Sequence, residues 1–163
     1  MNRVRLLLLV VILVPIVLVA GNLLLFDSTQ VSSSPNAHYA SFSVGGKTFG
    51  FTYVATNQTE LERGLMGRKV TNTTTMLFVF PTEGYYSFWM YGVNTSLDMM
   101  WVDVPPGSTT GHVVSMALGS PPCNVSVFCQ SYAPSAEANF VIEAKAGFAQ
   151  ANGVQVGTTV MLS

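Results

Sequence analysis

The first 26 residues contain an apolar segment that is too long and too uniform for the core of a small domain. Arg3 and Arg5 are followed by an uncharged apolar run from Leu6 to Phe26. About 20 helical residues cross a bilayer core that is roughly 30 Å thick. A buried core helix would need a polar face, which this run does not have. We therefore expect residues 1–26 to form an uncleaved signal anchor, because no clear small-x-small cleavage site follows the run.

The cations near this segment predict its orientation. After Arg3 and Arg5 the next cation is Lys47, and positive charges stay on the cytoplasmic side of a span. Residues 4–26 would then cross the plasma membrane once, with the N-terminus inside. Residues 27–38 are small and polar and would form a flexible stalk. Residues 39–163 would form an extracytoplasmic domain.

Two further features agree with export. Cys123 and Cys129 are the only cysteines, and outside the cell such a pair is expected to form a disulfide. Four N-x-S/T triplets predict candidate glycosylation sites, at Asn57, Asn72, Asn94 and Asn124. The few cations form no basic run, so we expect no nucleic-acid partner. Two cysteines and the nearest histidine, His112, do not make a tetrahedral zinc set, and we expect neither a metal nor a cofactor.

The pattern after residue 38 predicts a mostly β domain. Two alternating runs meet at Gly45 and Gly46, which is typical of a tight hairpin. Thr59 and Glu62 fit a capping box that begins a short helix ending at Gly67, and a second helical turn is expected before Gly153. Strands are expected at "MLFVF", "YSFWMY", "LDMMWVDV", "HVVSMAL", "NFVIEAK" and "VGTTVML". The fold class is therefore α+β, a small antiparallel β-barrel or sandwich with one or two short helices behind one transmembrane helix.

One acid interrupts an otherwise apolar strand. In "LDMMWVD" the side chain of Asp98 would point to the same face as Met100 and Val102. An unpaired buried carboxylate is costly, so Asp98 needs a partner. Arg63 and Arg68 are the candidates, because a guanidinium can grip a carboxylate with two hydrogen bonds.

Glu143 provides a second acid, facing away from Ile142. We hypothesise that Arg63, Asp98 and Glu143 form a cluster beside two strands rich in aromatic and sulfur side chains. The candidate ligand-binding residues are Arg63, Met66, Trp89, Met90, Asn94, Thr95, Asp98 and Glu143. Two interpretations stay open: an internal salt bridge that holds the helix to the sheet, or a polar-floored pocket with an aromatic wall.

The residue inventory favours binding over catalysis. No histidine lies near a serine or cysteine that could act as a nucleophile, so we expect no catalytic residues. The alternatives are a hydrolase of surface glycans that uses Asp98 and Glu143 as its acid pair, and a purely structural surface module. We expect a binding module whose partner is a glycan or a surface protein.

Five motifs, in order, resemble one known family. They are "ERGLMGR" (62–68), "MLFVF" (76–80), "SFWM" (87–90), "LDMMWVD" (97–103) and "FVIEAKAG" (140–147). In this order they resemble the domain of unknown function 192 family. The resemblance implies a compact, β-rich domain that is often exported, and no settled activity. Thr75, Ser96 and Thr158 depart from its usual glycine, proline and aspartate, and the loop around Gly92 is longer than usual.

Overall fold

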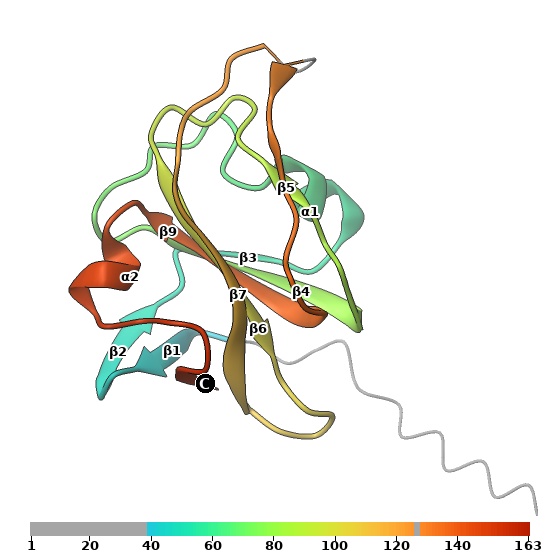
Figure 1. Cartoon of the computed structure of the whole chain (residues 1–163), viewed down its shortest axis with the longest axis vertical. Helices are drawn as coiled ribbons and strands as arrows, with labels where there is room; N and C mark the ends of the chain where they lie inside the picture. The colour runs from blue at the N-terminus through green and yellow to red at the C-terminus, as the bar shows by residue number, and fades with distance from the viewer. Residues whose placement is uncertain (1–38, 126–127) are drawn as a thin grey trace, which may run out of the picture. The chain divides into compact units, whose positions relative to one another are not determined.

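A computed structural model describes residues 39–125 and 128–163 of the chain (Figure 1). The predicted anchor (1–26) and stalk (27–38) lie outside the described residues. Within the part that is described, no helix has the length and apolar character needed to cross a membrane.

The first hairpin follows the sequence prediction. Strands β1 (Ser41–Val44) and β2 (Lys47–Gly50) pair antiparallel, with Val44 opposite Lys47. Gly45 and Gly46 form the turn with φ angles of +58° and +76°. Both angles are in the left-handed region that glycine adopts without steric cost, which confirms the predicted hairpin.

Most of the domain is one eight-stranded sheet with the order β2-β1-β10-β7-β6-β9-β4-β3. A separate two-stranded sheet pairs β5 with β8. All pairs are antiparallel except β3 with β4, which are parallel and joined through helix α1. The remaining bounds are β3 (Tyr53–Ala55), β4 (Thr75–Gly84), β5 (Phe88–Trp89), β6 (Leu97–Asp103), β7 (Thr110–Ser120), β8 (Ser131–Tyr132), β9 (Ala138–Lys145) and β10 (Thr159–Leu162).

The large sheet curls because its two edge strands are neighbours in the chain. Only Phe51 and Thr52 separate β2 from β3, although these strands stand at opposite ends of the strand order. Phe49 from β2 and Val54 from β3 pack against one inner core cluster. The predicted mostly β domain with one or two short helices is therefore confirmed, with two helices and a curled, partly open sheet (Figure 1).

The central strands bury both faces. On β6, Met100 and Val102 belong to the inner cluster, whereas Met99 and Trp101 belong to a second cluster on the outer face. Side chains alternate between the faces of a strand, so this division is the one that the sequence pattern predicts. The outer cluster is covered by the segment around helix α1 and by the β5–β8 pair, which supply partly buried residues to it.

Helix α1 (Gln58–Arg63) is displaced from its predicted start and end. Asn57 is the N-cap, and its Oδ1 accepts a hydrogen bond of 3.0 Å from the backbone N–H of Glu60. The side chain of Glu60 accepts one from Thr56 N–H at 3.1 Å. The predicted capping box at Thr59 and Glu62 is thus wrong by two residues, since Asn is at least as good an N-cap as Thr. The helix ends at Gly64 (φ +49°) rather than at Gly67.

Candidate functional site

The two buried acids lie on opposite faces of the large sheet. Strands β6 and β9 pair so that Asp98 is opposite Ala144 and Met99 is opposite Glu143. Directly paired residues share a face, and successive residues alternate. Asp98 therefore faces the inner core with Ala144, and Glu143 faces the outer core with Met99. The predicted cluster of Arg63, Asp98 and Glu143 is wrong for this reason.

Asp98 is bonded by backbone amides rather than by an arginine. Its side chain is 2% exposed. Oδ1 accepts a hydrogen bond of 2.9 Å from Gly119 N–H, and Oδ2 accepts bonds of 3.0 Å from Gly147 N–H and from Ala149 N–H. Gly147 is the N-cap of helix α2 (Phe148–Ala151), and a carboxylate there satisfies otherwise unpaired N–H groups. Asp98 thus joins β6 to β7 and to α2. These backbone N–H groups are the partners that its buried carboxylate requires.

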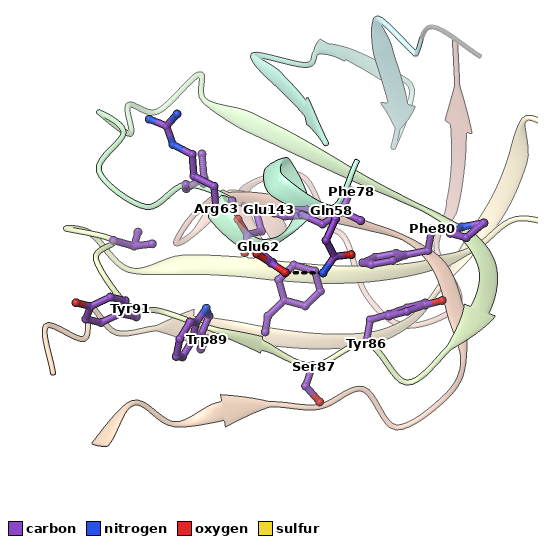
Figure 2. Close-up of a pocket in the computed structure, with 16 residues that line it drawn as sticks. Gln58, Glu62, Arg63, Phe78, Phe80, Tyr86, Ser87, Trp89, Tyr91 and Glu143 are labelled. Carbon is purple, nitrogen blue, oxygen red and sulfur yellow. Dashed lines mark hydrogen bonds between the residues drawn. The ribbon is translucent and has the colours of Figure 1, made fainter. Parts of the chain in front are cut away.

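A groove of about 550 Å³ opens on the outer face, between α1, β4 and the segment that carries β5 (Figure 2). A volume of this size is typical of small-ligand sites. Its walls are mostly apolar and aromatic, and Glu143 is the one acid that reaches it from the sheet. The lining residues are Gln58, Leu61, Glu62, Arg63, Gly64, Leu65, Phe78, Phe80, Pro81, Tyr86, Ser87, Phe88, Trp89, Tyr91, Val93 and Glu143.

Glu143 lies at the floor of this groove. It is 3% exposed, and among the described residues none donates a hydrogen bond to its carboxyl group. Only Asp103 Oδ1 and Ser120 Oγ, of the described side chains, are both shut off from solvent and unbonded. The Glu143 oxygens are therefore in contact with the groove. Burial raises the pKa of Glu143 from 4.5 to about 8, because a charged carboxylate is poorly solvated there.

Aromatic pairs fix the walls of the groove. The rings of Phe80 and Tyr86 stack with centroids 3.6 Å apart. Phe88 contacts Phe78 edge to face at 4.8 Å and Trp101 at 5.8 Å. Such pairs hold rings in one orientation, so the groove has a preformed apolar wall.

The outer rim carries the polar groups. Gln58 Nε2 donates a hydrogen bond of 2.6 Å to Glu62 Oε1, and both residues are on exposed turns of α1. Arg63 extends away from Glu143 in Figure 2, so it makes no pair with that acid. Trp89 is 48% exposed and lies 5.6 Å from Tyr91, ring to ring.

The structure brings together three of the eight candidate residues. Arg63, Trp89 and Glu143 line the groove, whereas the other five do not, namely Met66, Met90, Asn94, Thr95 and Asp98. Met90 is buried in the outer core, and Asn94 is exposed in the loop after β5. The sequence reasoning predicted an aromatic wall with Trp89 in it, but it missed the rings that build most of that wall, namely Phe78, Phe80, Tyr86, Phe88 and Tyr91. The density of rings in "MLFVF" and "YYSFW" was the available signal, although each run alone is equally typical of a core strand.

The structure also shows the predicted disulfide and the positions of the glycosylation candidates. Cys123 and Cys129 form the predicted disulfide, and the backbone of Cys123 forms a bridge with Tyr91 beside the groove. The four glycosylation candidates are all exposed, and glycosylation at them stays a prediction. Within residues 39–125 and 128–163 no three acidic, histidine or cysteine side chains gather as a metal site would require.

The fold and the groove together describe a mostly β domain that carries an aromatic-walled cavity above one buried acid. A family model described as "Uncharacterized ACR" matches residues 41–162, and the chain belongs to this family, DUF192. The earlier resemblance is thereby confirmed. A search of curated proteins finds no match.

Two solved structures have a similar fold. One is a protein of unknown function from Novosphingobium aromaticivorans, with a TM-score of 0.62 and 21% identity, covering 74% of this chain and 82% of that chain. The other, from Sinorhizobium meliloti, is named as a candidate transcription regulator; it has a TM-score of 0.58 and 22% identity, covering 76% of this chain and 95% of that one. At these identities the likeness concerns the fold alone.

Proposed function

We propose that this chain is a membrane-anchored, extracytoplasmic binding module, and that its ligand or partner occupies the groove beside α1. The observation that carries this proposal is Glu143, a buried carboxyl group at the floor of a preformed cavity, to which none of the described residues donates a hydrogen bond. Buried polar groups are normally satisfied, and an unsatisfied one costs free energy. A ligand group that bonds Glu143 would recover that cost.

Binding fits this geometry better than glycan hydrolysis by the predicted acid pair. A glycosidase needs two carboxyl groups on either side of one bond. Asp98 cannot supply the second group, because it is on the other face of the sheet and is bonded by three backbone amides. A purely structural module, the third alternative, has no need for an unbonded acid in a cavity.

The membrane part of the proposal rests on the sequence. The uncharged run from Leu6 to Phe26, and the lack of cations between Arg5 and Lys47, support one span with an outside C-terminal domain. Protease treatment of intact cells should degrade the domain and leave a fragment containing the anchor. Protection of the whole chain in intact cells, with cleavage only after lysis, would contradict this orientation.

Native mass spectrometry of the full chain, taken from its own membrane, tests the groove. We expect a non-covalent mass that is lost on denaturation. The variant Gln58→Trp enlarges an exposed side chain that lines the groove (Figure 2) and should abolish that mass. Gln150→Trp adds the same ring on α2, away from the groove, and should retain it. A chain that carries no extra mass in either state, or equal loading of both variants, would refute a ligand in this groove.

A further inference from the structure

We propose that the groove takes an organic cation, with a protonated amine seated on the Glu143 carboxylate and a short apolar body between the aromatic walls. This inference rests on the proposed function, since it names the ligand class of the same groove. It follows from the number, position and charge of the polar groups that a ligand would meet.

The depth of the polar groups favours a ligand with a single polar end. Glu143 is the only titratable side chain among the buried residues that line the groove. Gln58, Glu62 and Ser87 are all exposed at the rim. A sugar would need several polar partners along its length, because each unbonded hydroxyl group that leaves water costs free energy. The inner part of this groove has one such partner and rings elsewhere.

The aromatic wall favours a cation over an anion at that position. Aromatic faces carry negative electrostatic potential and attract cations within about 6 Å of the ring centre. A carboxylate beside aromatic rings is therefore a suitable pair of contacts for an ammonium group with a hydrocarbon body. An anionic ligand would meet both the acid and the ring faces unfavourably.

Among the residues that the structure describes, no cation pairs with Glu143. The titratable groups that line the groove with it are Glu62, Arg63, Tyr86 and Tyr91. Arg63 extends away from the acid (Figure 2). Among the nearby cations outside the groove, Arg68 lies 3.9 Å from the centre of the Tyr53 ring, and Lys145 Nζ donates a hydrogen bond of 2.8 Å to Asn72 Oδ1. Of the residues described, none supplies the counter-ion, so an incoming cation finds the position free.

Binding should release a proton. Burial holds the free carboxyl group protonated at neutral pH, with a pKa of about 8. A cation in contact lowers that pKa, because it favours the charged form. The O–H bond of the carboxyl group then breaks, the proton goes to the buffer, and the carboxylate pairs with the ammonium group. Affinity should rise by up to about tenfold per pH unit below pH 8 and level off above it.

Calorimetric titration of the full chain in detergent with three matched probes tests this inference. The probes are 2-phenylethylamine, which is protonated at neutral pH, 2-phenylethanol and 3-phenylpropanoate. We expect the amine to bind at least tenfold more tightly than the alcohol, and the acid more weakly than both. At pH 7, buffers of different ionisation enthalpy should report release of nearly one proton for the amine. Nα-acetyl-lysine methylamide then tests whether a lysine side chain can provide the same cation.

Two variants separate the buried acid from an acid outside the groove. Glu143→Gln should lose at least tenfold in amine affinity and all proton release, while the affinity for the alcohol is retained. Glu137→Gln, an exposed control outside the groove that removes the same charge, should change amine affinity by less than threefold and retain proton release. Thermal melting of both variants checks that each is folded.

The outcomes distinguish the two proposals. Equal or tighter binding of the alcohol, or amine binding without proton release, would refute the cation and leave the groove as a binding site. If none of the probes binds while a ligand is found by native mass spectrometry, the cation inference fails alone. If neither experiment detects a ligand, both proposals fail.

Discussion

Replacing Asp98 with Asn tests the strongest structural assignment in the domain. Three backbone N–H groups donate to the two carboxylate oxygens of Asp98, from Gly119, Gly147 and Ala149. An amide has one acceptor oxygen, so Asn must turn its NH2 group toward at least one of these donors. Hydrogen bonds to charged groups contribute about 1.5–3 kcal/mol each, and one or two are lost. We expect Asp98→Asn to lower the free energy of unfolding by about 2–4 kcal/mol.

Urea unfolding followed by circular dichroism measures this change, with the exposed Glu137→Gln as a control that alters the same charge. The control should remain within about 0.5 kcal/mol of the wild type, as is usual for surface substitutions. Hydrogen exchange should locate the loss at α2 and at the neighbouring end of β7. A variant as stable as the control, with unchanged protection at Ala149, would refute the view that Asp98 holds these elements together.

Three more predictions concern single features of the fold. The pKa of Glu143 is about 8 in the folded chain, against an ordinary value of 4.5. Its contribution to the free energy of unfolding is therefore complete below pH 4.5 and is lost as the pH rises to 8. The total loss is up to about 5 kcal/mol. Glu143→Gln should therefore match the wild type in urea unfolding at pH 5 and exceed it at pH 8; equal pH slopes would contradict this. Gly92 has φ +68°, and a Cβ there would lie 2.6 Å from Met66 Cγ, so Gly92→Ala should lower the melting temperature at a cost of about 1–3 kcal/mol; an unchanged melt would contradict the strain. Replacing Cys123 and Cys129 with Ser should cost only about 2 kcal/mol, because the sequence separation is 6; global unfolding of that variant would show a larger role for the bridge.

The local features of the domain could be predicted from the sequence because they depend on neighbouring residues. Gly45 and Gly46 supply the φ angles that their turn requires. The alternation in β6 assigns Met100 and Trp101 to opposite faces without any knowledge of the partner strand. Local reasoning was least accurate at the ends of helix α1. The helix begins after Asn57 and ends before Gly64, although Thr59 and Gly67 are equally suitable residues for those positions.

The relation between distant segments was decided by the tertiary structure alone. Whether Asp98 and Glu143 share a face depends on the register of β6 against β9, and a shift of one residue reverses the answer. Nothing within either strand specifies that register, since it is set by packing over the whole sheet. The groove likewise needs α1, β4 and β5 to meet on one face. The sequence by itself identified the two acids and the runs of aromatic residues as candidate parts of a site. Only the tertiary structure shows that Asp98 accepts hydrogen bonds from the backbone, and that Glu143 lies at the floor of a cavity with no hydrogen bond from any described residue. The physical reason is that strand pairing fixes the side of the sheet on which each side chain lies.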